Sequence, residues 1–308
     1  MEERRFIGLG FGLSATTAWG LFPIYWKQLS TVAPFEALCH KLLWSLGFAA
    51  IFITIEGRWF EVKALLGQPR KLLWFLLSGV LIALNGFLFI YAVASGRVIE
   101  TSLGYFLTPL TSVLLGVVFL QERLRALQRA AVMLALSGIL WLTLRYGHVP
   151  WLAMGLCLSF GSYGLVRKVA PAGSLVGYFL ETLFISPFAT VLILSLLVSN
   201  SGSFIQAGAR ISLLLFFAGL VTILPRLWFA AAARSISMTT LGILEYATPT
   251  IIFFLSTFAY HEPVTPDHLI AFGLVWLGIV IYGIESLTHE KIANQLQAKC
   301  RTCIFSPP

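Results

Sequence analysis

The most restrictive feature of this sequence is its succession of long apolar stretches. A helix that crosses the hydrocarbon core of a bilayer needs about 20 apolar residues. Ten such stretches cover residues 6–26, 36–55, 72–94, 100–120, 127–144, 151–168, 174–198, 211–233, 238–259 and 267–286. Backbone amides in lipid must bond within their own segment, which favours helices over strands. The sequence therefore predicts an all-α polytopic membrane protein with ten transmembrane helices.

The composition excludes a water-soluble fold. Charged residues make up 11% of the 308 residues, whereas they supply about a quarter of an average soluble domain. The first apolar stretch follows Arg4 and Arg5 as a signal peptide would. However, it is longer than an ordinary signal region and has no clear small-residue cleavage site. We expect it to be kept as the first crossing.

The positions of Lys and Arg predict the orientation. With the amino terminus inside, 15 of the 21 Lys and Arg residues fall in cytoplasmic segments. Four face outward: Lys27, Arg97, Arg145 and Arg210. Cytoplasmic loops of membrane proteins carry this excess of cations. The net charge of +8 therefore indicates topology and not a nucleic-acid partner, and both termini are predicted to be cytoplasmic.

An internal repeat divides the chain into two halves. The matching residues are 140 positions apart: Thr108, Pro109, Glu122 and Gly138 recur as Thr248, Pro249, Glu262 and Gly278. Each half has five crossings, an odd number, so the second half must enter the membrane in the opposite direction. We predict two inverted five-helix repeats, residues 1–148 and 149–287, followed by a cytoplasmic tail, 288–308. Secondary carriers use this construction and bind substrate near the membrane midplane.

Two prolines lie in the middle of predicted helices. Pro109 and Pro249 each remove one backbone donor and free the carbonyl four residues earlier, at Tyr105 and Glu245. Irregular backbone at this depth is tolerated where protein or a water-filled cavity covers it. The kinks are therefore predicted to line a substrate cavity, and a purely geometric kink is the alternative.

Charged residues inside the predicted helices are candidates for transport chemistry. Arg226 and Glu245 lie at similar depths on consecutive helices, about 10 Å from the helix ends at about 1.5 Å per residue. We predict that they pair, because an isolated charge in hydrocarbon is costly. In one interpretation Arg226 binds an anionic substrate group and Glu245 binds a cation or a coupling proton. In the other they form a permanent structural ion pair.

Further candidates line the predicted cavity. Lys41 and its repeat counterpart Glu181 place charges near the two mouths, although Lys41 can also snorkel outward. His40 could titrate near neutral pH if it is wetted. Polar tips on apolar bodies suit a ligand of mixed character, with packing as the alternative role; these residues are Trp19, Asn85, Tyr105, Tyr163 and Tyr246.

Other motifs indicate structure more than chemistry. Glu122 and Glu262 fall at helix ends, where we expect them to bond backbone amides or close a hairpin. Cys300 and Cys303 form a C-x-x-C in the tail, but zinc would need two more ligands, so an unstructured tail is expected. The sequence has no zinc-protease, nucleophile-elbow or phosphate-loop pattern. No catalytic residue, metal site or cofactor is predicted.

Several short segments together resemble the RarD branch of the EamA family, in the drug/metabolite transporter superfamily. They are residues 17–23, 40–45, 101–106, 163–168, 180–182, 239–242 and 248–250. The resemblance implies a ten-helix permease of the bacterial inner membrane with a central cavity between two repeats. RarD proteins are associated with chloramphenicol sensitivity and other EamA members export metabolites, so the resemblance does not settle a substrate.

These observations predict a secondary transporter, and not an enzyme, for a small metabolite or drug-like solute. Its partners are the solute, membrane lipid and a coupling ion, for which protons are favoured. A stripe of small residues on the first helix, Gly8, Gly12, Thr16 and Gly20, allows a monomer or a homodimer. A channel or a passive scaffold is the alternative, followed by an intramembrane enzyme. Substrate identity, flux direction, oligomeric state and the role of the cysteine tail are left open.

Overall fold

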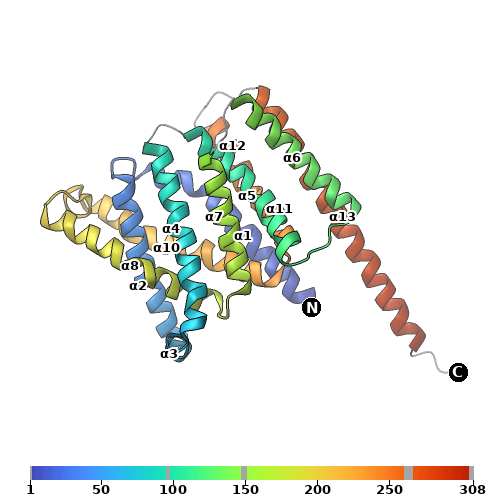
Figure 1. Cartoon of the computed structure of the whole chain (residues 1–308), viewed down its shortest axis with the longest axis horizontal. Coiled ribbons are helices and arrows are strands. Elements are labelled where there is room, and N and C mark those ends of the chain that lie inside the picture. The colour runs from blue at the N-terminus through green and yellow to red at the C-terminus, as the bar shows by residue number, and fades with distance from the viewer. Residues whose placement is uncertain (1, 95–97, 147–150, 260–265, 305–308) are drawn as a thin grey trace. The chain divides into compact units, whose positions relative to one another are not determined.

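The computed structural model describes residues 2–94, 98–146, 151–259 and 266–304, and this part of the chain is helical (Figure 1). The elements are α1 (Glu2–Lys27), α2 (Pro34–Ile55), α3 (Trp59–Leu66), α4 (Pro69–Ala94), α5 (Val98–Phe119), α6 (Ala126–Tyr146), α7 (Trp151–Val169), α8 (Ser174–Val198), α9 (Ser203–Gln206), α10 (Ala209–Ser235), α11 (Met238–Glu245), α12 (Ala247–Phe254), the π-helical turn η1 (Leu255–Ala259) and α13 (Pro266–Ile304). Each of the ten predicted stretches falls on one helix, except 238–259, which spans α11, α12 and η1.

Many of these helices can cross a membrane by length and composition. Seven of the described segments are long and apolar enough: α1, α2, α4, α6, α8, α10 and the segment Met238–Ala259. Two shorter apolar segments, Gly104–Phe119 and Leu269–Glu285, lie on α5 and α13. The chain is therefore a multi-pass membrane protein.

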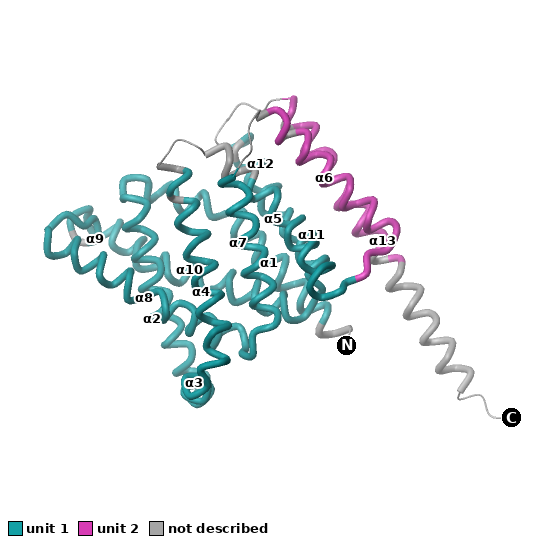
Figure 2. Tube along the Cα trace, viewed as in Figure 1, with its two compact units in different colours: residues 1–122, 149–262 teal, residues 123–148, 263–308 magenta. Residues whose placement is uncertain are grey.

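The helices form two compact units (Figure 2). Unit 1 consists of residues 1–122 and 149–262, and unit 2 of residues 123–148 and 263–308. In unit 2, α6 packs along α13. These two helices are the last predicted crossing of each half of the sequence, so the units cut across the predicted repeats.

In unit 1, α1 and α7 each pack against three neighbours. Helix α1 lies against α10, α11 and α12, and α7 lies against α4, α5 and α10. A buried apolar cluster joins these helices through Ala15, Tyr163, Phe229 and Ala232. A second buried cluster, which includes Ile53, Phe75, Val176 and Ile223, joins α2, α4, α8 and α10.

The sequence repeat recurs in the helix contacts of unit 1. A Cβ on Gly20 of α1 would lie 2.7 Å from Ile251 Cβ of α12, and a Cβ on Gly161 of α7 would lie 2.7 Å from Thr111 Cγ2 of α5. Thr111 and Ile251 are 140 positions apart, whereas Gly20 and Gly161 are 141 apart. The first and sixth predicted helices therefore match with an offset of one residue.

The same repeat is visible within unit 2. A Cβ on Gly138 would lie 2.7 Å from the carbonyl oxygen of Ala271, and a Cβ on Gly278 would lie 2.7 Å from that of Ala131. Both the glycines and the alanines are 140 positions apart. Each helix thus presents the same small residues to the other, which lets the two backbones approach closely.

The carboxyl-terminal tail departs from the expectation of an unstructured segment. Helix α13 continues to Ile304, well past the end of the last apolar stretch. The added segment is rich in Ala, Glu, Lys, Leu and Gln, which are good helix formers. The side chains of Cys300 and Cys303 lie outside those that the structure describes.

A close contact between the backbones of α10 and α2 leads to a stability prediction. A Cβ on Gly219 would lie 2.5 Å from the backbone nitrogen of Ser45, where α10 meets α2. We expect Gly219→Ala to lower the free energy of unfolding by about 1–3 kcal/mol, because two backbones must separate. Thermal unfolding of the purified protein in detergent measures this change.

Gly47 of α2 provides the matched control, because a Cβ there would meet no atom within 4 Å. Gly47→Ala should leave the melting temperature unchanged or raise it, since Ala favours the helix by about 1 kcal/mol. Equal melting temperatures for the two variants would contradict the close contact at Gly219.

Candidate functional site

Glu245 ends α11 and is buried, with 5% of its surface exposed. Its Oε2 accepts a hydrogen bond of 2.9 Å from the Ser112 hydroxyl of α5. Its Oε1 has no hydrogen-bond partner among the described residues. The neighbouring Tyr246 hydroxyl is also buried and has no hydrogen-bond partner in the described part of the chain. The end of α11 therefore carries a carboxylate and a hydroxyl whose hydrogen-bonding capacity is only partly used.

The helix is interrupted next to Glu245. Helices α11 and α12 are separated at Tyr246, three residues before Pro249. Proline cannot donate to the carbonyl four residues earlier, which is that of Glu245, so the interruption has the predicted cause. In contrast, α5 continues through Pro109. The predicted irregularity is therefore visible at Pro249, and a kink at Pro109 stays a prediction.

The predicted Glu245–Arg226 ion pair is wrong. Arg226 lies with its guanidinium carbon 5.9 Å from the centre of the Tyr178 ring, on α8, and forms no hydrogen bond or ion pair with a described residue. Glu245 instead faces α5 through Ser112. The two residues match in depth, but their helices turn them toward different neighbours.

Glu181, predicted to place a charge near one mouth of the cavity, belongs to a buried group on α7 and α8. Tyr163 donates a hydrogen bond of 3.0 Å to its Oε1, and Arg167 Nη1 lies 3.8 Å from its Oε2. Arg167 Nη2 also donates 3.0 Å to the Ser174 carbonyl. Arg167 and Glu181 are both 0% exposed. The pair is therefore removed from solvent completely.

Arg167 was not predicted as a site residue, because its place near a helix end is typical of a cytoplasmic cation. Two signals could have identified it. Arg167 and Glu181 carry opposite charges and lie on either side of the short turn that joins α7 to α8. In addition, Gly177 leaves room for the Arg167 guanidinium, which a Cβ at that position would strike.

Lys41 is the repeat counterpart of Glu181 and lies on α2. Its ammonium is 5.9 Å from the centre of the Trp26 ring of α1. It makes no hydrogen bond or ion pair with the described part of the chain. Lys41 is partly buried and has no carboxylate partner among the described residues.

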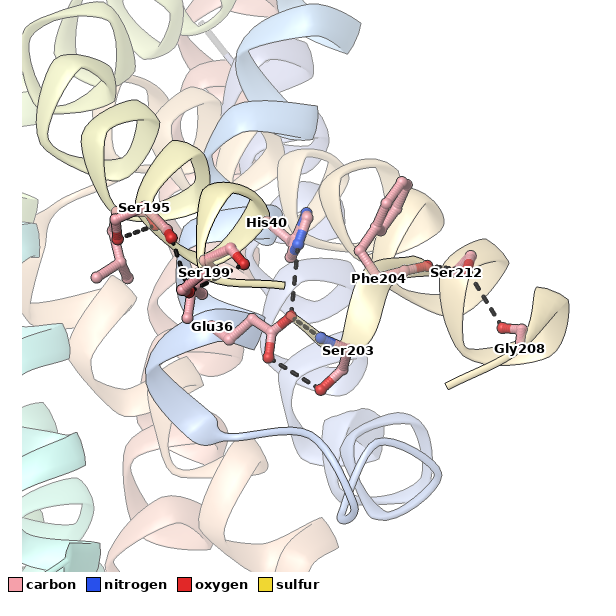
Figure 3. Close-up of polar contacts among 10 residues, drawn as sticks. Glu36, His40, Ser195, Ser199, Ser203, Phe204, Gly208 and Ser212 are labelled. Carbon is pink, nitrogen blue, oxygen red and sulfur yellow. Dashed lines mark hydrogen bonds and ion pairs between the residues drawn. The ribbon is translucent and has the colours of Figure 1, made fainter. Parts of the chain in front are cut away.

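His40 is engaged in packing between α2 and α9 (Figure 3). Its ring stacks on Phe204 with centroids 4.7 Å apart, and its Nε2 lies 3.9 Å from Glu36 Oε1. Glu36 accepts 2.5 Å from the Ser203 amide and 2.9 Å from the Ser203 hydroxyl. Glu36 and Ser203, which the sequence did not single out, thus fasten the connection between α8 and α10 to α2.

The remaining polar and aromatic candidates hold helices together. Asn85 of α4 donates 3.0 Å to both the Leu156 carbonyl and the Ser159 hydroxyl of α7. Trp19 packs against Phe160 and Phe229, with centroids 5.5 and 5.3 Å away. Tyr105 lies 6.3 Å from the Phe89 ring. Trp19 and Tyr163 share the ring cluster of Phe160 and Phe229.

Glu122 bonds backbone amides, as predicted, but these amides belong to α11 and not to its neighbours in the sequence. Its two carboxylate oxygens accept 2.7 Å from the Met238 amide and 2.9 Å from the Thr239 amide at the start of α11. These amides have no partner within their own helix, and a negative charge is favourable there. The prediction for Glu262 falls outside the described residues.

Apolar helices of membrane-spanning length and a charged interior define the class of a multi-pass membrane protein, and comparison with known proteins makes it a transporter. Residues 6–144 match the EamA-like transporter family. Protein RarD of Salmonella typhi is 37% identical over 284 residues, which are 92% of this chain and 97% of that protein. An uncharacterized transporter of Vibrio cholerae is 38% identical over 288 residues, 94% of this chain and 95% of its own length. The chain belongs to the EamA family, as a RarD-type member.

The fold is also shared with a solved structure. One crystal structure superposes with a TM-score of 0.66 at 17% sequence identity, covering 90% of this chain and 97% of its own. At this identity the likeness concerns the fold alone. The superposition therefore shows that the arrangement of helices in this chain also occurs in that protein.

The buried pair of Arg167 and Glu181 makes a second prediction. Arg167→Met or Glu181→Leu alone should lower the free energy of unfolding by roughly 3–5 kcal/mol, because each leaves a buried charge without its partner. The double variant should recover most of this loss, since an apolar pair costs no desolvation. Thermal unfolding in detergent of the unaltered protein, the two single variants and the double variant gives the interaction energy between Arg167 and Glu181.

The exposed pair of Arg145 and Asp267, 3.2 Å apart, serves as the control. Arg145→Met should change stability by less than about 1 kcal/mol, as is usual for ion pairs in water. A double variant no more stable than the worse single variant would show that Arg167 and Glu181 act independently.

Proposed function

We propose that this chain is a secondary transporter that carries a small metabolite or drug-like solute across the bacterial inner membrane by alternating access. Its two halves, residues 1–148 and 149–287, are inverted relative to one another, and both termini are cytoplasmic. The solute binds between the halves. The proposal specifies the mechanism within the transporter family to which the chain belongs.

The reciprocity of the helix contacts is the observation that carries this proposal. Gly20 meets Ile251 as Gly161 meets Thr111, and Gly138 meets Ala271 as Gly278 meets Ala131. Two halves that use the same contacts can exchange conformations at nearly equal energy, which is what a carrier with alternating access needs. A static scaffold gains nothing from such a duplication.

Charged groups in the apolar interior also support transport. Lys41, Arg226 and Glu245 lie on predicted membrane-spanning segments, and none of them forms an ion pair with a described residue. Ionisable residues within membrane helices are expensive and commonly mark substrate pathways or proton relays. A passive scaffold would have no reason to keep them.

Glu245 is the residue that we propose to carry a coupling proton. It is buried, accepts one hydrogen bond from Ser112 and has no cation beside it in the described structure. A carboxylate without a cation in an apolar site favours its neutral form. Solute binding or helix movement that wets the site would release the proton, and closure would take it up again.

Transport in proteoliposomes tests the proposal. A metabolite screen of cells with and without the chain first supplies the solute. Its flux through the purified protein should saturate and show counter-transport, since a carrier binds one solute per conformational cycle. Flux that rises linearly with solute concentration would favour a channel instead.

Glu245→Gln tests the coupling separately. An imposed pH gradient should accelerate flux several-fold in the unaltered protein and have no effect in Glu245→Gln, because the amide cannot exchange a proton. Solute exchange without a gradient should persist in this variant. Glu56→Gln, at the end of α2 where Glu56 contacts Arg58, is the control and should keep the gradient effect. An undiminished gradient effect in Glu245→Gln would assign the proton to another group.

A further inference from the structure

A short helix, α3, joins α2 to α4 within unit 1. It lies at the end of both helices, where the chain turns from one to the other (Figure 1). Helices α2 and α4 are long and apolar enough to cross a membrane, so α3 lies where the membrane meets water. The inner face of α3 is buried, with Val62 2% and Leu65 7% exposed, and belongs to the apolar cluster that includes residues of α2, α4 and α8.

Side-chain contacts fix the orientation of α3. The Trp59 ring packs against Phe179 of α8, with centroids 5.4 Å apart. Arg58 Nε donates 2.7 Å to Glu61, and its Nη1 donates 3.0 Å to Glu56. Glu56 and Glu61 are the two acidic residues in the sequence from 56 to 71, and both are bonded to Arg58. The carboxylates of this turn are therefore already in use.

The outer side of the turn carries apolar and basic residues together. Phe60 is 68% exposed and Leu66 is 46% exposed. Lys63, Arg70 and Lys71 are exposed as well and fall within nine consecutive residues. None of these three cations forms an ion pair with a described residue. We call these five residues the α3 patch.

The composition of the α3 patch distinguishes a membrane surface from water. A run of cations alone is commonly a solvated face, but large apolar side chains beside it gain nothing from exposure to water. Helices that lie on a membrane combine both kinds of residue, because the apolar side chains enter the acyl boundary while the cations stay at the headgroups. Anionic lipids attract such cations, whereas zwitterionic lipids carry no net charge.

We propose that the α3 patch binds the headgroup phosphates of anionic phospholipid. Lys63, Arg70 and Lys71 contact the phosphates, and Phe60 and Leu66 enter the upper part of the acyl layer. The buried face of α3 holds the patch in place against α2, α4 and α8, so the cations are presented without a folding step. This interaction surface goes beyond the proposed function and does not depend on transport.

Thermal unfolding in mixed micelles tests this surface. The purified full-length protein is melted in an uncharged detergent with increasing phosphatidylglycerol, or with phosphatidylcholine that has the same acyl chains. Phosphatidylglycerol should raise the melting temperature progressively, because it binds the folded protein, and phosphatidylcholine should have little effect. Lys63→Gln, Arg70→Gln and Lys71→Gln should each weaken lipid binding about fivefold, and the triple variant about a hundredfold. Salt at about 1 M should reduce the response of the unaltered protein, since it screens the charges.

A second triple variant separates the α3 patch from diffuse attraction to a basic protein. Arg123→Gln, Arg129→Gln and Arg210→Gln together remove the same charge from exposed positions elsewhere in the chain. This variant should keep the response to phosphatidylglycerol. Without lipid, the patch variant should melt like the unaltered protein, because its cations have no carboxylate partner in the described structure. An equal loss of response in both triple variants, or an undiminished response in the patch variant, would overturn the proposal.

A soluble headgroup separates a lipid site from a site for free phosphate. Glycerol 3-phosphate should not raise the melting temperature at concentrations where phosphatidylglycerol does, because it has no chains to bury. The double variant Phe60→Ser, Leu66→Ser should weaken the response to phosphatidylglycerol for the same reason. Equal stabilisation by glycerol 3-phosphate and by the lipid would contradict the assignment to phospholipid.

Discussion

Close approach of helices at small side chains is the contact on which this structure depends. Lipid chains are as apolar as Leu, so the hydrophobic effect does not draw helices together inside a membrane, and tight packing must do so. At Gly219 a Cβ would lie 2.5 Å from Ser45, and at Gly79 it would lie 3.4 Å from Ile185. Gly79 and Gly219 are 140 positions apart in the sequence, and so are Ser45 and Ile185. The contacts fix which face of each helix turns inward, and therefore which polar residues can meet.

Equivalent positions of the two halves carry different chemistry. Lys41 lies over Trp26, and the residues 140 and 141 positions later, Glu181 and Arg167, form an ion pair. The backbone arrangement is thus repeated while the charges are compensated in the second half and uncompensated in the first. A buried charge is costly to separate from its partner. The second half therefore has an internal ion pair at the positions where the cation of the first half has no carboxylate partner among the described residues.

The sequence predicted the helices well and the side-chain partners less well. Each of the ten apolar stretches is helical in the structure, and seven described segments are long and apolar enough to cross a membrane, because hydrocarbon imposes a minimum length on a crossing helix. The bonding of Glu122 to backbone amides was expected from its place at a helix end, but the helix that it caps, α11, was not. Depth alone, however, did not predict which residues meet. Glu245 and Arg226 are predicted at similar depths, but they lie on helix faces that point toward different neighbours. The rotation of a helix about its axis depends on how it packs against other helices, which the apolar pattern of a single helix does not specify. Arg167 was missed for a related reason, because a long side chain reaches well beyond the place of its own backbone.

The separation of Glu245 from Arg226 restricts how proton and solute can be coupled. Glu245 contacts α5 and Arg226 contacts α8, so no direct hydrogen bond links a proton on one to a solute beside the other. Coupling between separate sites requires an element with two arrangements that both sites bias. Helix α1 lies between them: its Thr16 carbonyl accepts 2.9 Å from Thr248 of α12, and its Trp19 ring lies 5.3 Å from Phe229 of α10. Movement at the interruption between α11 and α12 would displace the first contact, and solute binding beside Arg226 would act on α10 and the second. A carrier built this way would couple its proton to its solute through α1.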